Sequence, residues 1–129
     1  MTSRFTELVV DAHDPERLAS FWCEVLGFAV IDRSGGKVEI GSWEPTVEDV
    51  RARQMAPTLV FVPVPENKIV KNRLHLDVSP IDGSTEDEVA RLVGLGATTE
   101  DVGQGADATW QVMADPEGNE FCVLRTLAP

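Results

Sequence analysis

Apolar residues recur with helical spacing in two segments of the chain. The first apolar stripe follows Asp14 at positions i, i+3, i+4 and i+7, and consists of Leu18, Phe21, Trp22 and Val25. The second follows Ser84 and Thr85, either of which can cap a helix, and consists of Val89, Leu92 and Val93. Gly27 and Gly96 come after the stripes, where glycine often ends a helix. The pattern predicts one helix before each glycine.

Shorter apolar runs predict eight strands, two of which precede the predicted helices. They cover residues 4–12, 28–33, 37–42, 57–64, 72–80, 98–103, 108–114 and 120–124. The order β-α-β-β-β therefore occurs twice, and the distance from Glu7 to Leu26 (19 residues) nearly equals that from His75 to Leu95 (20 residues). We interpret the chain as an internal duplication of the α+β class. Module one covers about 1–68, module two about 69–129, and together they form a single domain.

Polar side chains alternate with leucines in the predicted strand 72–80. The period of two places Leu74, Leu76 and Val78 on one face and Arg73, His75 and Asp77 on the other. Two interpretations stay open. The polar face is solvent-exposed and its charges pair with one another, or it is the wall of a cleft that holds a ligand or a metal.

The segment 114–124, ADPEGNEFCVL, combines a tight turn with a strand that carries a cysteine. Asp115 to Asn119 are residue types that favour turns, and one strand face then carries Glu120, Cys122 and Leu124. The other cysteine, Cys23, lies far away in sequence and no CxxC pair exists, so free buried thiols are expected. In the first module, residues 43–55 are an insertion, expected to form a short exposed helix or a loop.

Charge and composition narrow the classes of partner. The chain has 129 residues, 43% hydrophobic and 26% charged, as expected of a soluble globular protein. A formal net charge of −11 disfavours nucleic acids and anionic membranes, which leaves small molecules and other proteins. No apolar run reaches the roughly 20 residues of a membrane span and no signal-peptide pattern is visible, so a cytoplasmic location is expected.

Three segments together resemble a known family. DPERLASFWCEVLGF (14–28), RLHLDV (73–78) and DPEGNEFCVL (115–124), within a duplicated βαβββ chain, resemble the glyoxalase/bleomycin-resistance/dioxygenase group. This group is the vicinal oxygen chelate superfamily, and the chain is most similar to its compact glyoxalase-like domain proteins. The resemblance implies two modules side by side, with an open, curled sheet of eight strands around a cleft and helices outside. It also implies a homodimer.

The resemblance further implies positions for metal ligands. Metal-dependent members carry ligands early in the first strand and on the last strand of each module. These positions fall on Glu7, His75 and Cys122, where an acid is usual in place of the cysteine; the remaining strand, 57–64, offers no ligand. A divalent ion, with zinc most compatible, would suit Glu, His and Cys. The alternative, which the sequence favours, is that Cys122 packs in the wall and no metal binds.

The remaining candidate residues support two hypotheses about function. Glu7 and His75 could form a general acid–base pair, while Arg73, Asp77 and three aromatic residues, Trp43, Phe61 and Trp110, could contact a ligand. The first hypothesis is a lyase- or isomerase-type enzyme on a small molecule, with a degenerate or absent metal site. The alternative is a non-catalytic protein that binds or sequesters a small molecule, as the drug-resistance members do.

Overall fold

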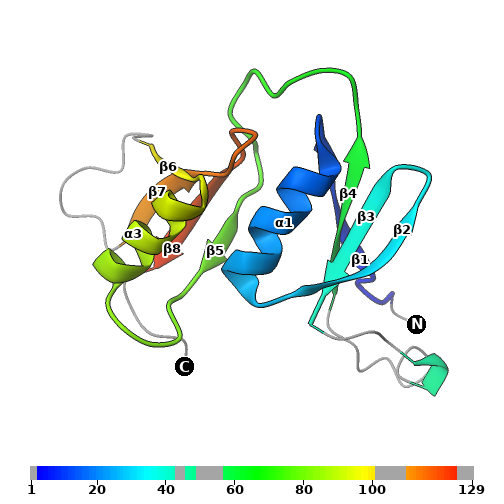
Figure 1. Cartoon of the computed structure of the whole chain (residues 1–129), viewed down its shortest axis with the longest axis horizontal. Helices are drawn as coiled ribbons and strands as arrows, with labels where there is room; N and C mark the ends of the chain where they lie inside the picture. The colour runs from blue at the N-terminus through cyan, green and yellow to red at the C-terminus, as the bar shows by residue number, and fades with distance from the viewer. Residues whose placement is uncertain (1–2, 43–45, 49–56, 101–109, 125–129) are drawn as a thin grey trace. The chain divides into compact units, whose positions relative to one another are not determined.

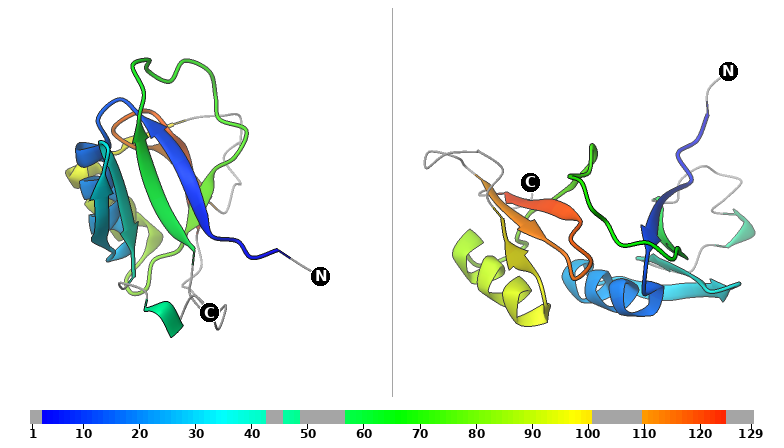
Figure 2. Two further views of the ribbon diagram at one scale, coloured as in Figure 1. Left: turned by 90° about the vertical axis from the view of Figure 1, so that its right-hand side faces the viewer. Right: turned by 90° about the horizontal axis from the view of Figure 1, so that it is seen from above.

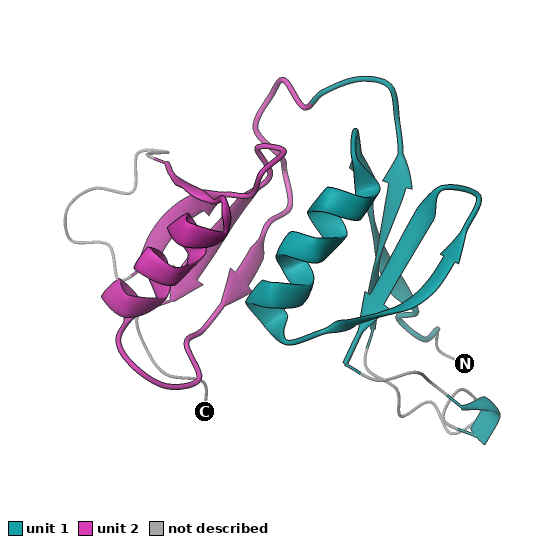
Figure 3. Ribbon diagram, viewed as in Figure 1, with its two compact units in different colours: residues 1–67 teal, residues 68–129 magenta. Residues whose placement is uncertain are grey.

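The computed structural model describes residues 3–42, 46–48, 57–100 and 110–124 (Figure 1). The chain divides into two compact units, residues 1–67 and 68–129 (Figure 3), and each is described by itself. This division falls beside the module boundary expected near residue 68. Trp43 and most of the 43–55 insertion lie outside the described residues.

Each unit consists of a β-α-β-β-β segment. Unit 1 contains β1 (Glu7–Ala12), α1 (Pro15–Leu26), β2 (Ala29–Ser34), β3 (Lys37–Gly41) and β4 (Thr58–Pro63). Unit 2 contains β5 (Leu76–Val78), α3 (Thr85–Leu95), β6 (Thr98–Thr99), β7 (Trp110–Ala114) and β8 (Glu120–Leu124). The predicted α+β class and its duplicated element order are confirmed, and both helices occupy the predicted ranges.

The two sheets share one topology. Their strand orders are β1-β4-β3-β2 and β5-β8-β7-β6, and in each the first strand of the unit pairs in parallel with the last. The remaining neighbours are antiparallel. In each unit the helix lies on one face of the sheet (Figure 2). A parallel first-and-last pair brings residues from the two ends of a unit into direct register.

The core of unit 1 lies between α1 and its sheet. Asp14 caps the helix by accepting a hydrogen bond from the Arg17 N–H (3.2 Å), and the stripe residue Leu18 is fully buried. Phe61, expected in the wall of a ligand cleft, has no exposed surface and belongs to this core with Val38 and Ile40. Phe61 is paired in register with Val38, which is also buried, so both side chains point to the same buried face and Phe61 belongs to the core, not to a ligand site.

The strand predicted at 72–80 is shorter in the structure, where β5 covers only Leu76–Val78. At Asn72 a side chain takes the place of a strand partner, since Glu120 Oε1 accepts the Asn72 N–H at 2.9 Å. Leu74 is exposed and does not share the helix-covered face, so the predicted alternation is wrong before residue 76. His75 therefore lies on the segment that enters β5. Among the described residues, no helix is long and apolar enough to cross a membrane.

Candidate functional site

A cavity of about 260 Å³ lies on one face of the unit 2 sheet. The strand register explains which residues line it. Asp77 on β5 is paired with Cys122 on β8. On β7, Val112 is paired with Cys122, and Trp110 is paired with Leu124. Side chains paired in this way point to the same face of a sheet. The lining consists of Lys71, His75, Asp77, Trp110, Val112, Glu120, Cys122 and Leu124.

Three potential metal ligands meet in this cavity. His75 Nε2 lies 3.3 Å from Asp77 Oδ1, and the Asp77 carboxylate is hydrogen-bonded to the Cys122 thiol. One ligand atom from each of the three residues lies within 4.8 Å of the others. His75 and Asp77 are about half exposed, whereas Cys122 is buried. The site therefore presents a nitrogen, an oxygen and a sulfur atom at the edge of a small cavity.

The surroundings of Cys122 favour its protonated thiol over the thiolate. Burial raises the pKa of Cys122 above its ordinary value, and the negative charge and hydrogen bond of Asp77 raise this pKa further. The ammonium group of Lys71 acts in the opposite direction and lowers it. A cation bound beside the sulfur would have to displace the thiol proton.

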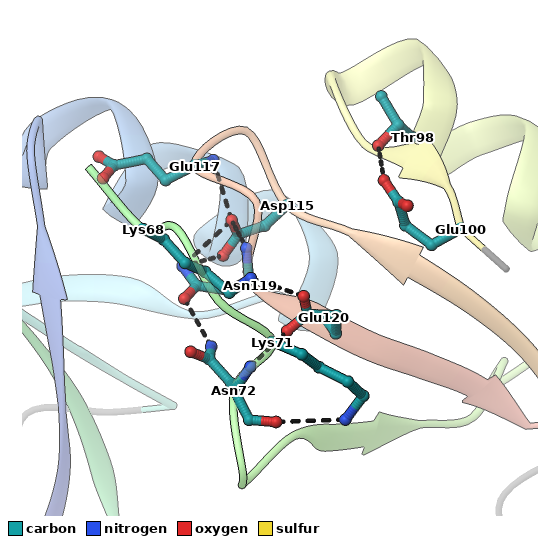
Figure 4. Close-up of polar contacts among 9 residues, drawn as sticks. All are labelled: Lys68, Lys71, Asn72, Thr98, Glu100, Asp115, Glu117, Asn119 and Glu120. Carbon is teal, nitrogen blue, oxygen red and sulfur yellow. Dashed lines mark hydrogen bonds and ion pairs between the residues drawn. The ribbon is translucent and has the colours of Figure 1, made fainter. Parts of the chain in front are cut away.

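A polar network at the start of unit 2 holds the entering segment against β8 (Figure 4). Lys68 Nζ contacts Glu120 Oε2 at 2.6 Å, and both side chains are largely buried. Asn72 Nδ2 donates to Asn119 Oδ1 at 2.8 Å, in addition to the backbone bond from Asn72 to Glu120. Burial alone would raise the pKa of Glu120, but the hydrogen bonds from Lys68 and Asn72 outweigh burial and lower it. The network positions Lys71 and His75, which lie on this segment.

The structure brings together four of the residues predicted from sequence: His75, Asp77, Trp110 and Cys122. Arg73 is exposed and is not part of the cavity lining. Glu7 is exposed on β1 in unit 1, and its predicted partnership with His75 stays a prediction.

Sequence reasoning missed four lining residues, Lys71, Val112, Glu120 and Leu124. For Glu120 the signal was present, because it shares a strand face with Cys122. Lys71 precedes β5 and has no periodic pattern that could have placed it.

The family model described as "Glyoxalase-like domain" matches residues 7–124, which is most of the chain. No curated protein matches at a significant level.

Solved structures share the fold at low sequence identity. A glyoxalase/bleomycin resistance protein/dioxygenase family enzyme from Burkholderia phytofirmans is 17% identical (TM-score 0.65), and the match covers 94% of this chain and 97% of that one. Glyoxalase I of Leishmania major is 14% identical (TM-score 0.62), with coverage of 96% and 87%. A variant of the fosfomycin resistance protein FosX from Listeria monocytogenes, in complex with Mn(II) and a dihydroxypropylphosphonic acid, is 11% identical (TM-score 0.66), with coverage of 96% and 90%.

Proposed function

The chain belongs to the glyoxalase-like domain family, and we propose that its unit 2 cavity binds a small oxygen-bearing molecule next to a zinc ion held by His75, Asp77 and Cys122. The observation that carries the proposal is the convergence of these three ligand atoms within 4.8 Å. A lyase or isomerase type of reaction is the activity that the family resemblance leads us to expect.

The donor set and its spacing fit zinc. Ligands about 2.0–2.3 Å from a tetrahedral zinc lie roughly 3.3–3.8 Å from one another. The contact between His75 and Asp77 (3.3 Å) is already in this range, and the whole group needs only small side-chain movements. Thiolate and imidazole favour zinc over magnesium or manganese. Three protein ligands also leave a coordination position open, as in catalytic zinc sites.

The residues around the proposed ion would have distinct tasks. When bound, zinc supplies a Lewis acid for a substrate oxygen. Trp110, Val112 and Leu124 form the apolar wall that limits the access of water to the bound molecule. Glu120 acts indirectly, because it holds the segment that carries His75 in place.

A second candidate function needs no metal. The Cys122 thiol is hydrogen-bonded to Asp77, which also contacts His75, so the three side chains have polar partners in one another without an ion. In this case His75 would transfer a proton while Asp77 orients its ring, or the protein would only bind and sequester its ligand. This alternative was favoured by the sequence alone.

Zinc affinity separates the two candidates. We expect the purified protein to bind one zinc ion per chain in competition with a chromogenic chelator. His75→Ala, Asp77→Asn and Cys122→Ser should each weaken binding at least about 10-fold, because each removes one ligand. Cys23→Ser is the matched control, since Cys23 lies on α1 in unit 1. Absence of stoichiometric zinc, or equal affinity in Cys122→Ser, would favour the metal-free function.

The assembly and location of the protein stay predictions of the sequence. We propose a cytoplasmic homodimer by analogy with the family. Light scattering of the purified protein tests whether it is a dimer, and fractionation of cells that express it tests whether it is cytoplasmic.

A further inference from the structure

We propose that the ligand of the unit 2 cavity is a small amphipathic monoanion, a carboxylate whose acid group pairs with Lys71 and whose apolar part lies on Trp110, Val112 and Leu124. This inference rests on the proposed function because it takes the same cavity as the ligand site. It adds the chemical class of the ligand, which neither the family nor the metal-ligand group defines.

Lys71 is the cation that remains available to a ligand in this cavity. The neighbouring Lys68 is already neutralised by Glu120 at 2.6 Å. Lys71 Nζ instead donates to the backbone carbonyl of Asn72 at 3.2 Å, and within the described part of the chain it forms no ion pair (Figure 4). An ammonium group has three N–H donors, so two remain for a ligand. Lys71 is itself among the residues that line the cavity.

Another part of the lining is apolar and includes an exposed aromatic ring. Trp110, the first residue of β7, retains 41% of its accessible surface. Its partner on the adjacent strand β8 is Leu124, and Val112 lies two residues further along β7. An aromatic ring beside branched aliphatic side chains favours the aryl or alkyl part of a small molecule.

The charges near Lys71 favour one negative charge on the ligand over two. Asp77 lies in the same cavity, and the whole chain carries a formal net charge of −11. Both repel anions, and this repulsion grows with the ligand's charge, whereas Lys71 offers a single positive charge. A carboxylate therefore suits the cavity better than a phosphate dianion. The cavity volume of about 260 Å³ also limits the ligand to a small molecule.

The test compares an acid with its neutral analogue. Hydrocinnamate and hydrocinnamyl alcohol share the same phenyl and alkyl groups and differ in charge. Calorimetric titrations use the full chain after removal of metal with a chelator, so that the carboxylate cannot bind an ion. We expect the acid to bind at least about 10-fold more tightly than the alcohol. Lys71→Met, which keeps an apolar stem, should reduce this ratio to below about 2-fold.

Lys37→Met is the matched control, because it makes the same change in net charge on β3 of unit 1. It should preserve the preference for the acid. Equal affinity of acid and alcohol, an unchanged ratio in Lys71→Met, or no binding of either probe to the wild-type protein would each overturn the inference. Zinc affinity, measured separately, tests whether the proposed metal site binds an ion. A protein that binds zinc but does not prefer the acid would refute this inference alone.

Discussion

Asp115 shows how a residue of the sequence signature serves the framework of the site. Its buried carboxylate accepts hydrogen bonds from the backbone N–H groups of Glu117 and Asn119, each at 2.9 Å, and from the Asn119 amide. Asn119 in turn accepts a hydrogen bond from Asn72. The DPEGN turn therefore fixes both the β7–β8 hairpin and the segment that carries His75.

Cys122 shows what the sequence could and could not predict at this scale. Its burial and free thiol follow from the strand pattern and from the absence of a second nearby cysteine. Its contact with Asp77 depends on the parallel register of β5 and β8, which joins segments 45 residues apart (122 − 77). Periodicity assigns a face to each residue but does not identify its partner in another strand.

Glu120 leads to a prediction about pH. Its pKa in the folded protein is below the ordinary value of 4.5, so its contacts stabilise the fold above that pH and are lost as the pH falls below it. We expect Glu120→Gln to lower the free energy of unfolding at neutral pH by about 1–2 kcal/mol. The difference from wild type should shrink towards zero well below the ordinary pKa of the carboxyl.

Chemical denaturation at a series of pH values measures this difference. Glu66→Gln, which removes an exposed carboxylate from unit 1, serves as the control and should have little effect on stability. A Glu120→Gln difference that stays constant down to the lowest pH would show that the charge of Glu120 does not stabilise the fold.

At the scale of elements, local signals predicted the helices well and β5 poorly. Helix ends are marked by side chains within the same segment, such as the Ser84 hydroxyl that accepts the Asp87 N–H at 3.0 Å. The segment that enters β5 is instead held by Glu120, 48 residues after Asn72, whose carboxylate accepts the Asn72 N–H. The alternation of leucines around residue 74 does not reveal a contact over that sequence distance, so the strand was predicted too long.

Two glycines of unit 2 give a matched prediction. Gly118 has φ 88° in the DPEGN turn, whereas Gly94 lies in helix α3, and a Cβ at either position would meet no atom within 4 Å. Only backbone conformation therefore separates the two substitutions. We expect Gly118→Ala to destabilise the protein by about 1 kcal/mol or more, and Gly94→Ala to stabilise it by about 0.5–1 kcal/mol.

Thermal unfolding followed by circular dichroism tests this pair. The melting temperature should fall for Gly118→Ala and rise for Gly94→Ala. If both substitutions shift it in the same direction, the left-handed conformation of Gly118 does not determine the stability of the hairpin.

At the scale of the whole molecule, the two units share one topology but differ in the potential metal ligands on their equivalent strands. The two units have equivalent parallel strand pairs, but where unit 2 pairs Asp77 with Cys122, unit 1 pairs Val9 with Val60. Strand β4, which the resemblance expected to carry the remaining ligand, offers no metal-binding side chain. The duplication was predictable from the repeated pattern. The contact of Asp77 with Cys122 was not, because the strand pattern places Asp77 on the polar face with His75 but does not give the register between β5 and β8.

X-ray absorption at the zinc edge tests the central claim most directly, because it detects the atoms bound to the ion. For protein loaded with one zinc per chain, we predict one sulfur at about 2.3 Å together with nitrogen and oxygen at about 2.0–2.1 Å. The sulfur signal should disappear in Cys122→Ser and persist in Cys23→Ser. A spectrum of the wild-type protein with nitrogen and oxygen alone would contradict the assignment of His75, Asp77 and Cys122 as the metal site.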